Sequence, residues 1–247
     1  MTDKTPSTRK SSHVHTREAR GPAGTSNDQE IAAFLQKAKT MSSGSGGGGR
    51  LLFALDATMS RQPTWDTACR LQAEMFHEVA NIGSLNVQLV YFRGFGECRA
   101  SKWVSDGKAL AGMMSRIACQ GGHTQIGRVL QHAISGTRQK RINALIYVGD
   151  CMEENADNLC ALAGELGMRK VPAFVFQEGA DRTAEQTFRE IARLTKGAFC
   201  RFDSGSAKQL GELLRAVAVY AAGGHKALIA FRDRGEAGGR KLLEQMR

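Results

Sequence analysis

Apolar runs alternate with helical patterns from residue 50 onward, and this alternation constrains the fold more than any other feature of the sequence. An unbroken apolar run such as 51–55 is typical of a strand that is buried on both faces of a sheet. Apolar residues at spacings of three and four, as in 126–134, are typical of a helix with one buried face. Strands that alternate with helices predict a parallel sheet covered by helices, which is an α/β fold.

The same patterns give a provisional list of elements. We expect strands at 51–55, 86–92, 97–104, 144–148, 171–176 and 198–202, and helices at 64–82, 110–117, 126–134, 156–166, 184–194 and 207–221. The turn Gly94-Phe-Gly96 predicts that the third strand returns antiparallel beside the second. The sequence therefore predicts a Rossmann-like open, mostly parallel sheet of about six strands, with helices on both faces and one antiparallel edge strand.

Composition divides the chain into four regions. Residues 1–27 are polar and basic without an apolar period, so we expect a disordered tail. Residues 28–49 predict a short amphipathic helix followed by a Gly/Ser linker, because SSGSGGGG occupies 42–49. Residues 50–221 form the predicted α/β domain, and 222–247 form a basic C-terminal extension. The sequence leaves open whether this extension packs on the domain or recruits an acidic partner.

Charge and composition narrow the classes of function. The formal net charge of +10 would attract acidic partners, including RNA, yet only 6% of the residues are aromatic and no zinc-finger or RNP-type motif is present. No apolar run approaches the roughly 18 residues of a membrane span, so we expect no membrane insertion. The six cysteines form no CxxC pair, which favours reduced thiols and the cytoplasm.

Oxygen-bearing side chains follow two of the expected strands. Asp56 ends the first strand, with Thr58 and Ser60 at alternate positions after it, and Asp150 ends the fourth strand. Thr124 lies in a loop that opens a helix. A single aspartate at a strand end is usually a helix cap or turn former. Five oxygen donors at one edge of a sheet instead suit Mg²⁺ or Mn²⁺.

These residues resemble the metal-ion-dependent adhesion site (MIDAS) of von Willebrand factor A (VWA) domains, and the similarity is to intracellular members of the bacterial type. The family motif is Asp-x-Ser-x-Ser after the first strand, a threonine from a later loop and an aspartate that ends the fourth strand. This sequence carries it as Asp56-Ala-Thr58-Met-Ser60, Gly122-His-Thr124 and Gly149-Asp150. The resemblance covers roughly 50–221 and retains a hydroxyl at 58, where threonine replaces serine. It implies that Ser60, Thr58 and Thr124 bind the metal directly or nearly so, and that Asp56 and Asp150 act partly through water.

The resemblance also implies a function. Such a site binds an acidic residue of a protein partner, and intracellular members commonly act as adaptors in assemblies with chaperones or AAA+ ATPases. We therefore expect a metal-dependent binding protein that is not an enzyme, with His123 and Gly122 as candidate partner contacts. RNA binding of the Ro type is the alternative, although those proteins pair the domain with helical repeats.

A metal-dependent phosphoryl-transfer or hydrolytic enzyme is the third possibility. A haloacid-dehalogenase-type site requires a second aspartate at position 58, where threonine stands, and no GxSxG elbow occurs. Cys151 lies beside Asp150, but without an obvious base we interpret it as a structural thiol. We interpret Glu153, Glu154 and Asp157 as complements of the dipole of the helix that follows them.

Overall fold

The computed structural model describes residues 49–65, 85–202 and 207–246, and at its centre is a six-stranded sheet in the order β3-β2-β1-β4-β5-β6. Only β3 runs antiparallel, and it lies at one edge. The predicted mostly parallel sheet with an antiparallel edge strand is confirmed. The strands are β1 (Arg50–Asp56), β2 (Asn86–Arg93), β3 (Glu97–Ala100), β4 (Ala144–Gly149), β5 (Ala173–Glu178) and β6 (Ala198–Phe202).

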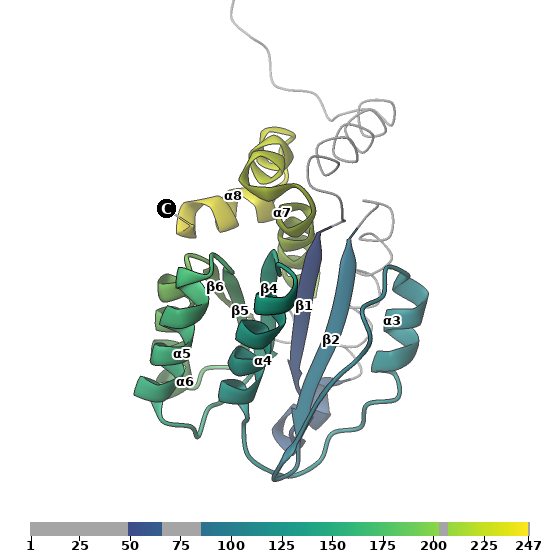
Figure 1. The fold of residues 1–247 in the computed structure, drawn as a ribbon, viewed down its shortest axis with the longest axis vertical. Helices are drawn as coiled ribbons and strands as arrows, with labels where there is room; N and C mark the ends of the chain where they lie inside the picture. Colours follow the sequence, from purple (N-terminus) through teal and green to yellow (C-terminus); the bar gives the residue numbers. More distant parts are fainter. Residues whose placement is uncertain (1–48, 66–84, 203–206, 247) are drawn as a thin grey trace, which may run out of the picture.

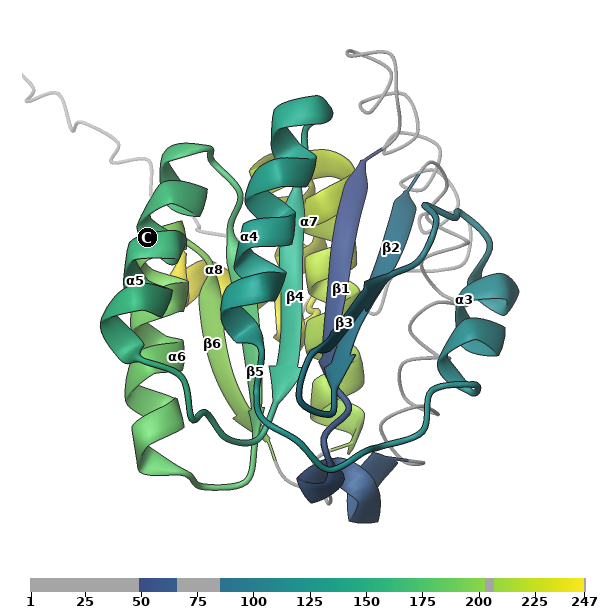
Figure 2. The ribbon, with the colours of Figure 1, turned by 60° about the horizontal axis from the view of Figure 1, so that its bottom comes forward.

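Helices cover both faces of this sheet (Figures 1 and 2). One face packs against α4 (Ile126–Gln139), α5 (Ala156–Met168) and α6 (Arg182–Thr195). The opposite face packs against α3 (Gly107–Met114), α7 (Ala207–Asp233) and α8 (Ala237–Gln245). A short 3₁₀ helix, η1 (Met59–Thr64), follows β1 at the carboxyl edge of the sheet, where Figure 2 shows it below the strand ends. The sheet is therefore the middle layer of three.

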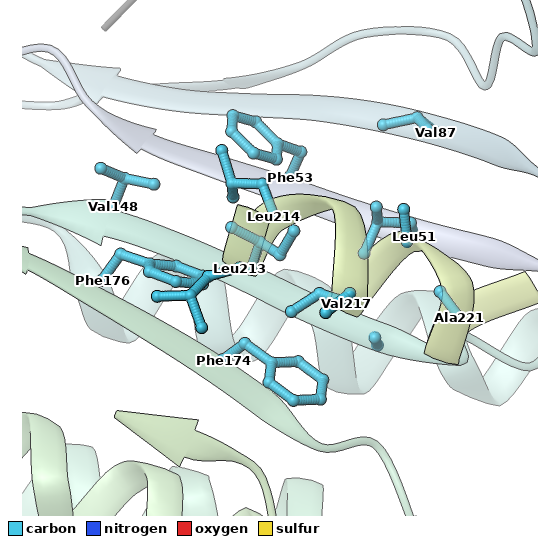
Figure 3. Packing of buried hydrophobic residues seen from close by; sticks show 14 of the residues in the cluster. Leu51, Phe53, Val87, Val148, Phe174, Phe176, Leu213, Leu214, Val217 and Ala221 are labelled. Atoms are coloured by element: carbon cyan, nitrogen blue, oxygen red, sulfur yellow. The ribbon is translucent and has the colours of Figure 1, made fainter. Parts of the chain in front are cut away.

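Alternate residues of the central strands enter the two cores. In β1, Leu51, Phe53 and Leu55 face α7, whereas Leu52 and Ala54 belong to the cluster on the other face. Figure 3 shows Phe53 beside Leu214 of α7, within the cluster that also includes the aromatic side chains of β5. Both faces of β1 are buried, which explains why its sequence is an unbroken apolar run.

Two strands differ from their predicted bounds. The strand expected at 97–104 ends at Ala100, because the hydroxyl of Ser101 accepts a hydrogen bond from the Leu89 amide at 3.0 Å in place of a ladder carbonyl. The Ser101 amide still donates to the Leu89 carbonyl at 2.8 Å, and farther along the two segments meet in an isolated bridge between Val87 and Val104. The strand expected at 171–176 lies at 173–178; it begins after Pro172, whose carbonyl accepts a hydrogen bond from the Leu145 amide at 2.9 Å but which has no amide to donate.

The N-terminal predictions and most of one helix lie outside the described residues. These are the tail at 1–27, nearly all of 28–49 and the greater part of the helix at 64–82. Gly49 is described and is buried, and its carbonyl accepts a hydrogen bond from the Asn86 amide at 2.7 Å. Thr64, expected to cap that helix, is the last residue of η1.

The C-terminal extension packs on the domain. The helix expected at 207–221 continues to Asp233 as α7, with a kink at Gly224, whose φ is 68°. Leu228, Phe231 and Leu242 are buried in the same core as β1. The side chain of Gln245 in α8 accepts a hydrogen bond from the Phe199 amide of β6 at 2.7 Å. Residues 222–246 therefore add to the hydrophobic core.

No helix in the described ranges combines the length and the apolarity that crossing a bilayer requires.

Candidate metal centre

The candidate site lies where the strand order reverses. β1 pairs with β2 on one side and with β4 on the other, so the chain leaves β1 and β4 in opposite directions along the sheet. Asp56 is the last residue of β1, and Asp150 directly follows β4. In open α/β sheets the carboxyl edge at such a switch point is where ligands bind. The fold therefore places both aspartates at the position that favours a ligand.

The two carboxylates have oxygens without a hydrogen-bond partner. Asp56 is fully buried, and its Oδ1 accepts a hydrogen bond from the Thr58 amide at 2.8 Å. Its Oδ2 and the Oδ1 of Asp150 are buried without a hydrogen-bond partner in the structure. Buried carboxylate oxygens in this state are costly unless a cation or a proton neutralises them. One carboxylate oxygen from each aspartate and the sulfur of Cys151 lie within 4.8 Å of one another. These residues fit a divalent cation.

Burial changes the proton affinity of the first aspartate. Removal from solvent raises the pKa of Asp56 from its ordinary 3.8 to about 7, and the negative charge of Asp150 acts in the same direction. The hydrogen bonds from Thr58 and the positive charge of Arg61 act in the opposite direction but are weaker than the effect of burial. A bound cation would favour the ionised carboxylate.

The two hydroxyl residues after β1 lie together. Thr58 Oγ1 and Ser60 Oγ are 3.1 Å apart, and Thr58 is buried whereas Ser60 is exposed. Thr58 forms a parallel β-bridge with Gln120, and the backbone amide of Gln120 donates a hydrogen bond to the Ala57 carbonyl at 3.0 Å. The end of β1 is thereby joined to the loop that carries Thr124.

Thr124 is held by the segment that follows β4. Its amide donates to Glu153 Oε2 at 2.8 Å, and its Oγ1 accepts from the Glu153 amide at 3.2 Å. Thr124 is buried, and the proton of its hydroxyl remains available for a further hydrogen bond. The two loops that supply Thr124 and Asp150 are thus fixed to each other.

The acidic residues after Asp150 differ from their predicted role. Glu154 does not complement α5, because that helix begins only at Ala156 with Asn155 as its cap. Its carboxylate instead accepts hydrogen bonds from the Ile126 and Gly127 amides, at 2.5 and 2.8 Å, and so caps the N-terminus of α4. Of the three residues, only Asp157 lies in the first turn of α5.

Gly122 and His123, the predicted partner contacts, have different environments. A β-carbon at 122 would overlap the backbone of Gly94, so Gly122 permits close packing between its loop and the turn after β2. His123 is exposed, and its ring lies edge to face with Phe95 at a centroid distance of 5.2 Å. Phe95 is 83% exposed and Met59 is 53% exposed. Neither was predicted as a contact, although the Gly94-Phe-Gly96 turn was a visible signal for the former.

Cys151, which was not among the site residues predicted from the sequence, also lies beside the two aspartates. Burial, together with the charge of Asp150 and a hydrogen bond to it, raises the pKa of the thiol to about 12. The side chain is therefore a protonated thiol at neutral pH in the absence of a metal. Its position beside Asp150 was visible in the sequence, but its distance from Asp56 depends on the pairing of β1 with β4.

The structure thus collects the predicted ligands at one edge. Asp56, Thr58, Ser60 and Asp150 lie at the ends of β1 and β4, and Thr124 lies in the loop that pairs with the end of β1. Their role as metal ligands stays a prediction.

Comparisons with known proteins agree on the fold. No family profile matches the sequence, and no curated protein matches it. Among solved structures, a von Willebrand factor type A protein from Catenulispora acidiphila is similar, with a TM-score of 0.56, 17% identity, and coverage of 70% of this chain and 43% of that one. The SpRpn10 VWA domain has a TM-score of 0.54 and 11% identity, with 64% and 89% coverage.

A third similar structure is proximal thread matrix protein 1 from the mussel byssus, which has a zinc-occupied MIDAS motif. Its TM-score is 0.56 at 14% identity, with 70% of this chain and 46% of that chain covered. The chain therefore spans less than half the length of the Catenulispora acidiphila and mussel proteins. The six-stranded sheet, its order and these similarities lead to one conclusion: the protein contains a domain with the von Willebrand factor A fold.

Proposed function

We propose that the protein is a metal-dependent protein-binding module in which a divalent cation of the Mg²⁺ or Mn²⁺ type receives an acidic residue of a partner. The residues that would hold the cation are Asp56, Thr58, Ser60, Thr124 and Asp150. The observation that carries the proposal is the pair of buried carboxylate oxygens without a hydrogen-bond partner, on Asp56 and Asp150, at the switch point of the sheet. Divalent cations prefer such oxygen donors, and the zinc-occupied MIDAS of the mussel protein supports a divalent ion on this fold.

The residues divide between a buried side and an exposed side of the site. Asp56 and Thr58 are buried, whereas Ser60 is exposed to solvent. When bound, the cation supplies positive charge and an exchangeable coordination position for a carboxylate. The hydroxyls contribute oxygen without adding negative charge, so only the two aspartates offset the charge of the cation, and its exchangeable position can still receive a carboxylate.

Exposed apolar side chains provide further contacts beside this site. Met59 lies between the two hydroxyl residues in sequence, and Phe95 stands on the turn after β2 with His123 against it. The turn is held firmly, because Gln125 Nε2 donates to the carbonyls of residues 93, 94 and 97, and Arg128 Nη1 donates to the Gly96 carbonyl at 2.6 Å. Exposed aromatic side chains, phenylalanine among them, are enriched in the contact surfaces of proteins. We propose that Phe95 and Met59 contact the partner around its acidic residue.

We further propose that the module acts without catalysis. The thiol nearest the two aspartates, Cys151, is protonated at neutral pH because its pKa is about 12, so it is a poor nucleophile. The partner class implied by the resemblance, a chaperone or AAA+ ATPase assembly in the cytoplasm, belongs to this proposal as well. Hydrolysis of a generic phosphoester that disappears with Asp56→Ala would contradict the proposed lack of catalysis.

Metal binding can be tested on the purified chain. We expect Mg²⁺ or Mn²⁺ to raise the melting temperature of the wild type and to leave Asp56→Ala unchanged. Asp157→Ala is the matched control, because it removes an exposed carboxylate in the first turn of α5 and should retain the metal response. A wild type that does not respond to any divalent cation would contradict the site.

Partner binding can be tested by affinity capture with the same variants. A partner that meets the cation should be retained by the wild type in Mg²⁺ and lost in chelator, with Asp56→Ala and with Ser60→Ala. Phe95→Ser should weaken capture while leaving the metal response intact, because its side chain is 83% exposed. Capture that survives chelator and both site variants would contradict a metal-bridged contact. Binding of RNA with a steep loss of affinity as salt rises would favour the RNA alternative.

A further inference from the structure

The sulfur of Cys151 lies in the same cluster as the two aspartates. One ligand atom from each of Asp56, Asp150 and Cys151 lies within 4.8 Å of the other two. Asp56 is fully buried, and its Oδ2 has no hydrogen-bond partner in the structure. Together these two observations indicate a place for a cation that sulfur can reach. The predicted ligand set contained oxygen alone.

We propose that Cys151 is a metal ligand, and that the site therefore takes a thiophilic divalent cation of the Zn²⁺ class more tightly than Mg²⁺. This inference rests on the divalent-cation site of the proposed function and concerns the identity of its ion. A site of oxygen donors alone favours hard cations, whereas a thiolate favours zinc, cadmium and cobalt. Two carboxylates and one thiolate also make a three-ligand set, which leaves a fourth position for a water.

The chemistry of binding is a proton exchange without oxidation. The S–H bond of Cys151 breaks, its proton passes to solvent, and a sulfur–metal bond forms with the electron pair of the thiolate. No oxidant or reductant is needed.

The segment around Cys151 is held in place on both sides. β4 ends one residue before Asp150, and Asn155 caps α5 four residues after Cys151. Between them, the Glu153 carboxylate accepts a hydrogen bond from the Thr124 amide, and the Glu154 carboxylate accepts one from the Gly127 amide at the N-terminus of α4. A ligand on a fixed segment loses little freedom when the metal binds, so the sulfur is well placed to contribute to affinity.

The test compares hard and soft ions on the full chain and on three variants. Cys151→Ser removes the proposed ligand, Cys160→Ser removes a partly buried thiol on α5 as the matched control, and Asp56→Asn removes the central carboxylate. Affinities for Mn²⁺ and Zn²⁺ are measured by calorimetric titration, and Co²⁺ is used as a spectroscopic probe of sulfur ligation.

We expect bound Co²⁺ to show a thiolate-to-metal charge-transfer band in the wild type and in Cys160→Ser, and no such band in Cys151→Ser. The Zn²⁺ affinity should fall by about tenfold or more with Cys151→Ser. The Mn²⁺ affinity should change by less than about twofold, because that ion depends on the oxygen donors.

Two results would overturn the inference. The first leaves the proposed divalent-cation site intact, and the second removes it. Mn²⁺ binding that needs Asp56, with no charge-transfer band and equal Zn²⁺ affinity in Cys151→Ser, removes the sulfur ligand but keeps the cation site. Absence of binding by Mn²⁺, Zn²⁺ and Co²⁺ removes both.

Discussion

Arg61 and Glu178 form a buried ion pair that fastens η1 to the end of β5. The arginine side chain is fully buried and that of the glutamate is 12% exposed. Arg61 directly follows Ser60, so the pair helps to set where the exposed hydroxyl lies relative to the sheet. It also places a positive charge close enough to Asp56 to oppose the rise in the pKa of that carboxyl.

Removal of this arginine should destabilise the protein strongly. Arg61→Ala leaves Glu178 without its cation and is expected to lower the free energy of unfolding by about 3–5 kcal/mol. Arg138→Ala is the control, since its pair with Glu165 is exposed on the arginine side and should contribute less than about 1 kcal/mol. Urea denaturation of both variants measures the difference. Equal losses in the two variants would contradict a structural role for the buried pair.

Some of this site could be predicted from local patterns and some could not. Asp56 and Asp150 each end an apolar run, and the rule that parallel strands share a carboxyl edge brings them together. The partner of Arg61 lies 117 positions away, at the end of β5, and nothing in the sequence near Arg61 shows that this arginine is buried. The fold can be predicted from hydrophobic periodicity, which is a local pattern. Buried ion pairs depend on the packing of the complete fold.

The C-terminal extension illustrates the same difference. Gly223 and Gly224 interrupt the helical pattern, and the basic residues beyond them resemble those of a solvated tail. In the structure, Gly224 has a non-helical backbone conformation that kinks α7, and the helical segment after the kink places Phe231 in the core. A glycine pair predicts a change of direction but not what the chain meets afterwards.

Protonation of Asp56 should make the metal-free protein more stable at low pH than at neutral pH, as far as this group is concerned. In the unfolded chain this carboxyl loses its proton near its ordinary pKa of 3.8, whereas in the folded protein it keeps the proton up to a pKa of about 7. Between these values the folded state binds more protons than the unfolded state, so this group makes stability fall as pH rises. The slope due to this one group is at most about 1.4 kcal/mol per pH unit.

The measurement is chemical denaturation in chelator at several pH values between 4.5 and 7.5. Asp56→Asn should remove this component of the slope and should be more stable than the metal-free wild type at the upper end. Saturating divalent cation should restore the wild type at neutral pH and leave the variant unchanged. Identical pH profiles for wild type and variant in chelator would show that Asp56 does not titrate in this window.

Glu154 should link the stability of α4 to the affinity of the site. Glu154→Ala removes the acceptor for the Ile126 and Gly127 amides, and the loss of a helix cap is expected to cost about 1–2 kcal/mol. The start of α4 directly follows the loop that carries Thr124, so the metal affinity should also fall. Glu154→Gln keeps one acceptor oxygen and should lie between the wild type and Glu154→Ala. Denaturation and metal titration of both variants test this order, and unchanged metal affinity in Glu154→Ala would separate the cap from the site.

Two adjacent glycines provide a matched test of the loop geometry. In Gly122→Ala the new methyl group would overlap the carbonyl group and α-carbon of Gly94, which are backbone atoms that cannot rotate away. A β-carbon at Gly121 meets no atom within 4 Å, so Gly121→Ala adds the same group one residue earlier without a clash. Overpacking of this kind costs about 1–3 kcal/mol and displaces the backbone around it.

The loop is joined to the end of β1 through Gln120 and to the segment after β4 through Thr124. A displaced loop should therefore move Thr124 away from the two aspartates. We expect Gly122→Ala to lower both stability and metal affinity, and Gly121→Ala to change neither appreciably. Thermal melts with and without Mn²⁺ compare the two variants directly. If Gly122→Ala bound metal as the wild type does, the contact between this loop and the turn at Gly94 would have no part in forming the site.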